Sequence, residues 1–139
     1  DINIINSHFD GLDIDFSNLE IQNINIENSG NDCLDISSSI LEIDTFYSNN
    51  CVDKSLSIGE KSTVKITTFE SLQSNIAVAV KDSSNVTISN KLGIENDMCI
   101  AMYRKKQEFG PSYLKIENYL CDGKSENFIQ YGQELVVDN

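Results

Sequence analysis

The sequence predicts an all-β fold, a single-stranded right-handed parallel β-helix of about six turns with roughly 22 residues in each turn. Two observations predict it: short apolar segments recur at a nearly constant spacing, and an amide residue recurs in front of them. Within each segment apolar and polar residues alternate, which is the period of a half-buried strand rather than of a helix. Stacked copies of such a repeat pair strand on strand and bury one continuous core.

Each predicted turn contains three short strand segments. The first carries inward pairs 22 residues apart: Leu12 and Ile14, Leu34 and Ile36, Leu56 and Ile58, Val78 and Val80, Ile100 and Met102. The second is Leu19 to Ile21, Leu41 to Ile43, Val64 to Ile66, Val86 to Ile88 and Leu114 to Ile116. The third pairs Ile2 with Ile4, Ile24 with Ile26, Phe46 with Ser48, Phe69 with Ser71, and Leu92 with Ile94. We expect these side chains to form columns inside the coil.

A column of amides marks one bend of every turn. The spacings are 22 or 23 residues, and the members are Asn6, Asn28, Asn50, Gln73 and Asn96. Amides in register can donate to the turn on one side and accept from the turn on the other. Asparagine also tolerates the left-handed backbone conformation that a tight bend uses. The pattern therefore predicts an asparagine ladder.

The fifth turn contains an insertion. Eleven residues from Tyr103 to Tyr113 separate the first and second segments, and they include the basic group Arg104, Lys105 and Lys106. This stretch must leave the coil as a loop. Loops on a rigid scaffold often carry function, so the three basic residues are candidate ligand contacts; the alternative is a loop that only covers the rod.

Charge limits the kinds of partner. The chain has 22 acidic and 10 basic residues, a net charge of −12, and no extended basic stripe. Nucleic acid is therefore excluded as a partner, because binding to phosphates depends on clustered Lys and Arg. No run of 18 apolar residues is present, so no membrane insertion is expected.

One acidic group could bind a cation. Asp13 and Asp35 are predicted to be outward neighbours on adjacent turns, with Asp15 at the next outward position. Carboxylates at that distance raise one another's pKa or recruit a cation such as calcium. The alternative is a solvated acidic face; no other cofactor is expected. Lys54 is predicted to stack on Asp32 as an ion pair between turns.

The four cysteines are predicted to be free and mostly buried thiols. Cys33 and Cys99 share a column but lie three turns apart, about 14 Å at the spacing of paired strands, which is beyond disulfide reach. Cys121 should point inward, in the column of Ile26 and Ile94. Free thiols leave a cytoplasmic location open beside the extracellular or cell-surface location that we expect.

Four stretches carry a family resemblance. They are DGLDIDFS at 10–17, NSGNDCLDIS at 28–37, DKSLSIGE at 53–60 and YRKKQEFG at 103–110. Over nearly its whole length the chain resembles the pectin-lyase-like superfamily of right-handed β-helices, and more narrowly uncharacterised bacterial surface β-helices, some joined to spore-coat-protein-H-like domains. The resemblance implies a polysaccharide connection without naming a reaction. We expect residues 1–139 to be one β-helix domain from the C-terminal part of a longer protein.

Three functions remain open. The leading hypothesis is a non-catalytic scaffold or glycan-contacting module of an exported or surface protein. The second is a polysaccharide-active enzyme, a lyase, hydrolase or epimerase, with an acidic and calcium-binding site; no residue is assigned as catalytic. The third is an assembly module whose exposed tips associate end to end.

Overall fold

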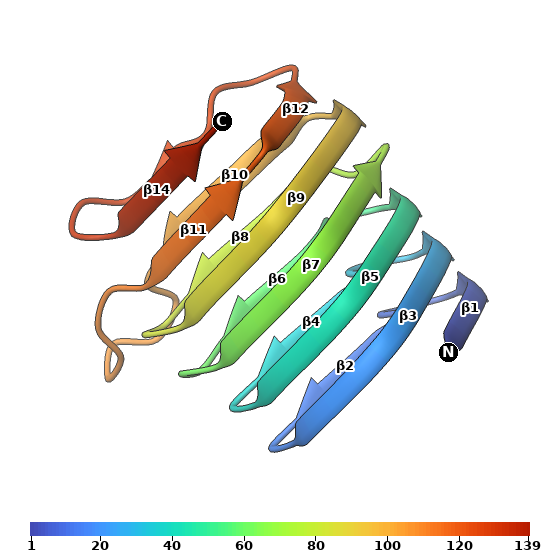
Figure 1. Ribbon diagram of the computed structural model, residues 1–139, viewed down its shortest axis with the longest axis horizontal. Coiled ribbons are helices and arrows are strands. Elements are labelled where there is room, and N and C mark those ends of the chain that lie inside the picture. Colours follow the sequence, from blue (N-terminus) through green and yellow to red (C-terminus); the bar gives the residue numbers. More distant parts are fainter.

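The computed structural model describes all residues from Asp1 to Asn139 as a parallel β-solenoid without helices (Figure 1). Sheet B has six strands, one for each turn: β2 (Leu12–Asp15), β4 (Leu34–Ser37), β6 (Lys54–Gly59), β8 (Ile76–Lys81), β10 (Met98–Tyr103) and β13 (Phe128–Ile129). Sheet A contains β1 (Ile2–Ser7), β3 (Asn18–Ser29), β5 (Ile40–Cys51), β7 (Thr63–Leu72), β9 (Asn85–Asn96), β11 (Tyr113–Glu117), β12 (Tyr119–Gly123) and β14 (Glu134–Asp138). The two sheets lie one behind the other, with the chain ends at opposite ends of the rod (Figure 1).

The predicted columns are confirmed in register. Leu12 pairs with Leu34, and Leu34 with Leu56, in successive strands of sheet B. The second and third segments of each turn, expected as separate strands, run on as one strand in β3, β5, β7 and β9. In the fifth turn they are separate as β11 and β12, which both pair with β9. Each turn before the fifth therefore consists of one short and one long strand.

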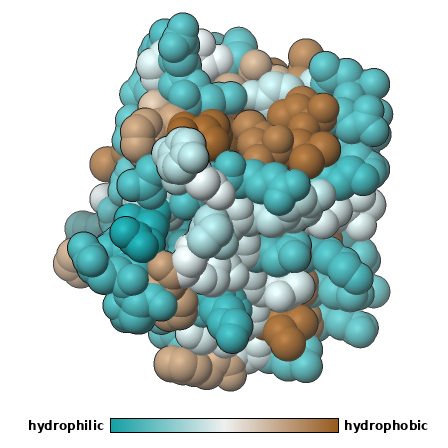
Figure 2. Space-filling model, turned by 90° about the vertical axis from the view of Figure 1, so that its left-hand side faces the viewer, coloured by the Kyte–Doolittle hydropathy of each residue, from teal (hydrophilic) through white to brown (hydrophobic).

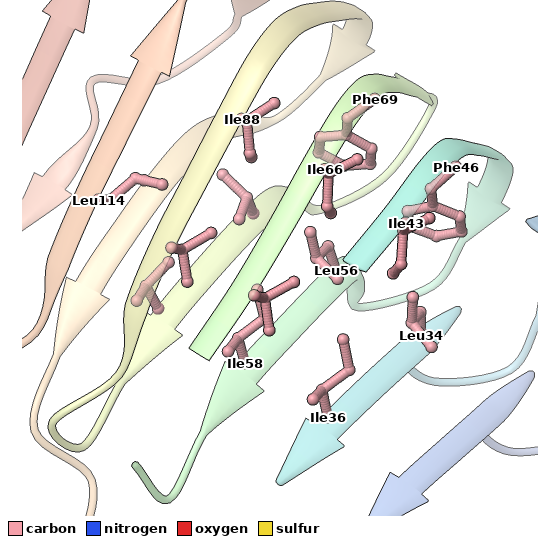
Figure 3. Packing of buried hydrophobic residues seen from close by; sticks show 14 of the residues in the cluster. Leu34, Ile36, Ile43, Phe46, Leu56, Ile58, Ile66, Phe69, Ile88 and Leu114 are labelled. Carbon is pink, nitrogen blue, oxygen red and sulfur yellow. The ribbon is translucent and has the colours of Figure 1, made fainter. Parts of the chain in front are cut away.

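The core lies between the two sheets. Stacked aliphatic side chains from each turn fill it, and Figure 3 shows Leu34, Leu56 and the neighbouring isoleucines pointing into the space between the strands. Phe46 and Phe69 stack with ring centroids 5.3 Å apart, and both are fully buried. Identical residue types in one column thus pack on each other, which is how a 22-residue repeat buries its apolar face.

The third segment of the fourth turn, at the end of β9, differs from the prediction. Phe69 pairs with Lys91, and Ser71 with Gly93, so Lys91 and Gly93 point inward. Leu92, expected inside, is only partly buried, and Ile94 is 41% exposed. The expectation that Leu92 and Ile94 fill the core is therefore wrong for this turn. Successive side chains of a strand point to opposite faces, so every second residue points into the core. In this strand one of those inward residues is a lysine.

The prediction of free thiols is also wrong. Disulfides join Cys33 to Cys51 and Cys99 to Cys121, with Cα atoms 5.5 and 6.3 Å apart. The register argument correctly excluded a bond between Cys33 and Cys99, but it considered only residues in the same column. Both bonds cross a corner of the solenoid and join sheet B, or the turn beside it, to sheet A.

The insertion forms a loop as predicted, between the end of β10 at Tyr103 and the start of β11 at Tyr113. The C-terminal end of the rod exposes several apolar side chains, including Leu120 and Phe128. Figure 2 looks onto this end and shows hydrophobic patches set among polar surface. The structure has no helix whose length and apolar character would let it cross a bilayer.

Candidate functional site

Three carboxylates meet at the N-terminal end of sheet B. Asp13 and Asp35 pair across β2 and β4 as predicted, and Asp10 is the third member. Their nearest ligand oxygens all lie within 4.8 Å of one another. Asp15 pairs instead with Ser37 and is not part of this acidic trio. Burial raises the pKa of Asp13, and the charges of Asp15, Asp35 and Asp10 raise it further.

The acidic trio meets only part of what a calcium site needs. Calcium takes six to eight oxygen ligands, and three carboxylates leave the remaining positions to water or to a ligand. Asp10 is also engaged within the protein, because its Oδ1 accepts hydrogen bonds from the backbone N–H of Asp32 and the side chain of Asn31. The group is open on one side, since Asp13 is exposed.

A row of charged side chains continues from this trio along the outer face of sheet B. The predicted ion pair between turns is confirmed, with Lys54 Nζ 3.7 Å from Asp32 Oδ1. The same amine lies 2.6 Å from a carboxylate oxygen of Asp53. The Lys54 and Asp32 side chains are largely sheltered, whereas Asp53 is partly exposed, so the ion pair with Asp32 is the one that holds the turns in register.

Lys81 is a feature of this face that sequence reasoning missed. Its side chain runs across Gly59, where a Cβ would lie 3.4 Å from Lys81 Cε, and its Nζ donates to Ser57 Oγ at 2.9 Å. Burial lowers the pKa of Lys81, and the nearby charge of Asp35 opposes this effect. The signal in the sequence is Gly59, one turn before Lys81 in the same column, which leaves room for a long side chain.

The amide column forms near the C-terminal ends of the sheet A strands. Asn28 Nδ2 donates to Asn6 Oδ1, and Asn50 Nδ2 to Asn28 Oδ1, each at 3.0 Å, which fits an asparagine ladder. Next in the column, Gln73 Nε2 donates to Glu95 Oε2 at 2.8 Å.

All five members of this column have positive φ angles, from 55° at Gln73 to 64° at Asn6. Glu95 takes the place at the end of β9 that the sequence assigned to Asn96. The side chain of Asn96 is buried instead, where its Oδ1 accepts from Ser71 Oγ and from the backbone N–H of Ser74.

A second column of amides and carboxylates runs beside the ladder. Its members follow at intervals of 22 residues: Asn31, Asp53, Asn75 and Asp97. Asn75 Nδ2 donates to Asp53 Oδ1 at 3.3 Å. Between the two columns lies a groove of about 560 Å³, which we call the ladder groove; it is lined by Asn50, Cys51, Val52, Gln73, Ser74, Asn75, Glu95, Asp97 and Lys124.

The basic loop group is divided by the structure. The backbone N–H groups of Lys105 and Lys106 donate to Asp82 Oδ1 at 2.7 and 2.9 Å. The Lys106 amine pairs with Glu60, whereas Arg104 lines a separate pocket near the C-terminal end. Lys106 and Arg104 thus differ in their surroundings, and the contact of the three residues with a ligand stays a prediction.

Comparison with known protein families, curated proteins and solved structures finds no match. The class that the fold defines is a parallel β-solenoid, and the function must be argued from the surfaces described above.

Proposed function

We propose that this chain is a non-catalytic β-helix module of an exported or cell-surface protein and that it contacts a glycan through the ladder groove. The observation that carries the proposal is the lining of the groove, where amide and carboxylate groups recur along the solenoid axis. The repeat distance between turns is about 4.8 Å, which is comparable with the length of one sugar ring. An extended glycan along the axis would therefore meet equivalent groups at successive rings.

The ladder leaves unused hydrogen-bonding groups where the groove lies. The side-chain bonds of the column run from Asn6 to Asn50 and again from Gln73 to Glu95, with none joining Asn50 to Gln73. Asn50 Oδ1 and Gln73 Oε1 are thus free to accept. Sugar hydroxyls both donate and accept, so they match a lining of amides and carboxylates.

The charge of the groove favours a neutral glycan. Glu95 and Asp97 contribute two carboxylates, and Lys124 contributes one amine that lies 3.4 Å from Asp97. The remaining negative charge would repel an acidic polymer, and the net charge of −12 acts in the same direction. A neutral chain of hydroxyl-bearing rings avoids this repulsion.

The disulfides support export. Disulfides persist in oxidising compartments and are uncommon in the cytosol, and this chain has two. Membership of the pectin-lyase-like superfamily, which the sequence resemblance suggests, would add a polysaccharide connection. We include that membership in the proposal.

The test is binding of a panel of neutral oligosaccharides, measured by isothermal titration calorimetry. Asn75→Ala removes a groove amide, and we expect it to weaken binding about twofold to tenfold, the effect of one hydrogen bond. Asn25→Ala is the matched control, because Asn25 donates to Asn3 at 2.8 Å in another pair of turns, outside the groove. The proposal fails when no neutral oligosaccharide binds, or when both variants lose affinity equally.

A polysaccharide-active enzyme is a second candidate, favoured by one observation. Lys81 lies on the same face as the acidic trio. Burial lowers the pKa of its amine, and the charge of Asp35 raises it. A base beside a cation-binding cluster is the arrangement that proton abstraction from an acidic sugar requires. Calcium should then raise the melting temperature, and Asp13→Ala or Asp35→Ala should abolish the rise. No calcium effect and no turnover on uronic acid polymers would reject this candidate.

A further inference from the structure

A second cavity lies where the inserted loop meets the turn between β13 and β14. Its volume is about 280 Å³, and we call it the tip pocket; it is lined by Arg104, Gly110, Pro111, Gln130, Tyr131, Gly132 and Gln133. None of these residues lines the ladder groove. The inference below is therefore independent of the proposed function.

The two glutamines of the tip pocket present donors only. Gln130 Oε1 accepts a hydrogen bond from the backbone N–H of Arg104 at 2.7 Å. Gln133 Oε1 accepts from the backbone N–H of Ser112, also at 2.7 Å. A backbone N–H can only donate, so each amide oxygen must face it and each Nε2 must point the other way. Neither Nε2 group has an acceptor in the structure.

The guanidinium of Arg104 has no partner either. It is the only arginine of the chain, and none of the ion pairs or side-chain hydrogen bonds of the structure involves its guanidinium nitrogens. The tip pocket thus gathers a guanidinium and two amide NH₂ groups without a single matching acceptor. Such a set matches an oxygen-rich anion, because hydrogen bonds to a charged acceptor are stronger than those to a neutral acceptor.

The pocket also offers a ring surface and a fixed backbone. Tyr131 is fully exposed, and with Pro111 it offers a ring face beside the donors. The backbone N–H of Gln130 donates to the carbonyl of Met102 at 2.8 Å, and that of Gln133 to the carbonyl of Gln130 at 3.1 Å. The two glutamine donors are therefore held in place before a ligand arrives, which lowers the entropy lost on binding.

We propose that the tip pocket binds a carboxylate group attached to a ring. Arg104 would hold the two carboxylate oxygens with parallel N–H donors, the geometry that makes arginine prefer carboxylates. The amides of Gln130 and Gln133 would donate to the same oxygens, and the ring would lie against Tyr131. The carboxylate can belong to an aromatic acid or to a sugar acid, and the chemistry of recognition is the same.

The experiment titrates the whole chain with two matched pairs of probes, followed by NMR: benzoate against benzamide, and glucuronate against glucose. We expect at least one acid to shift the signals of Gln130 and Gln133, and its neutral partner to leave them unchanged. Binding of glucuronate assigns the source to a sugar acid, and binding of benzoate alone assigns it to an aromatic acid. If neither acid binds, or if a neutral probe binds as well as its acid, the proposal is overturned.

A variant pair tests the residue assignment. Arg104→Gln keeps the backbone N–H that orients Gln130 but removes the guanidinium, and we expect the affinity for the bound acid to fall at least tenfold. Lys105→Gln is the control, because it removes an equal charge from the neighbouring exposed residue. Both positions are exposed, so folding should persist, which the spectrum of the free variant verifies. Equal losses in both variants would show a general charge effect and contradict the proposal.

Discussion

Replacing Lys91 by methionine is predicted to stabilise the protein at pH 7 and to remove most of the rise in its stability between pH 7 and 9. The Lys91 side chain is 2% exposed, and its Nζ has no hydrogen-bond partner. The amine lies 5.8 Å from the ring centroid of Phe69 and 5.4 Å from that of Tyr119. Burial alone lowers the pKa of Lys91 to about 7, with no contribution from a charged neighbour.

The magnitude follows from the difference between the folded and unfolded pKa values. In the unfolded chain the amine has its ordinary value of 10.5, so from pH 7 to 10.5 the unfolded state binds more protons than the folded state. The free energy of unfolding therefore rises with pH in this window, and the full penalty is present below about pH 7. At about 1.4 kcal/mol for each pH unit of pKa difference, the penalty is about 5 kcal/mol, and about 2 kcal/mol of it is relieved between pH 7 and 9.

Urea unfolding at pH 7, 8 and 9 measures this effect. Wild type should gain about 2 kcal/mol over the range, and Lys91→Met should be nearly flat and roughly 4 kcal/mol more stable than wild type at pH 7. Lys65→Met is the control, because the Lys65 side chain is 68% exposed, and it should keep the wild-type slope. A slope in Lys91→Met as steep as that of wild type would refute the reasoning, since the titrating amine would then not be Lys91.

Three other substitutions test the packing. Removing the disulfide between Cys33 and Cys51 with alanines should lower the free energy of unfolding by about 3 kcal/mol, the loop entropy for a separation of 18 residues; a loss below 1 kcal/mol in urea unfolding would argue against this link. Gly30→Ala places a Cβ 2.0 Å from the backbone oxygen of His8, so the melting curve should show a loss of about 1–3 kcal/mol from overpacking, and unchanged melting would count against the described approach of the two turns. Asp82→Ala removes the acceptor that anchors the inserted loop, so trypsin should cleave the loop faster than in wild type, and equal cleavage rates would contradict the anchoring role.

The solenoid could be predicted because the same apolar pattern recurs in every turn. A column such as Leu12, Leu34 and Leu56 fixes the strand register at several successive turns. A one-residue shift of the strand pairing would expose every member of the column at once. The pairing of Asp13 with Asp35 followed from the same register. The third carboxylate, Asp10, could not be found in this way, because it lies in a bend and not on a strand.

The inner positions at the end of β9 could not be predicted from hydrophobic alternation. Hydrophobicity favours Leu92 and Ile94 at the inward positions. However, a Cβ at Gly93 would lie 2.5 Å from Cys121 Sγ. Only a glycine leaves room for the disulfide beside it, so Gly93 lies inside and alternation brings Lys91 inside with it. The disulfide itself was missed because it crosses a corner. The structure keeps a spacing of 22 residues from Phe69 and Ser71 to Lys91 and Gly93, whereas the apolar pattern placed Leu92 and Ile94 one residue later.

The proposed contact of a neutral glycan with the ladder groove is tested most directly by NMR. The side-chain amide signals of Asn50, Gln73 and Asn75 report on it directly during an NMR titration with a neutral oligosaccharide selected by calorimetry. Saturable shifts of these three signals, with the amide of Asn25 unmoved, are the result that we predict. Shifts confined to sheet B or to the tip pocket, with the groove amides unchanged, would contradict the claim.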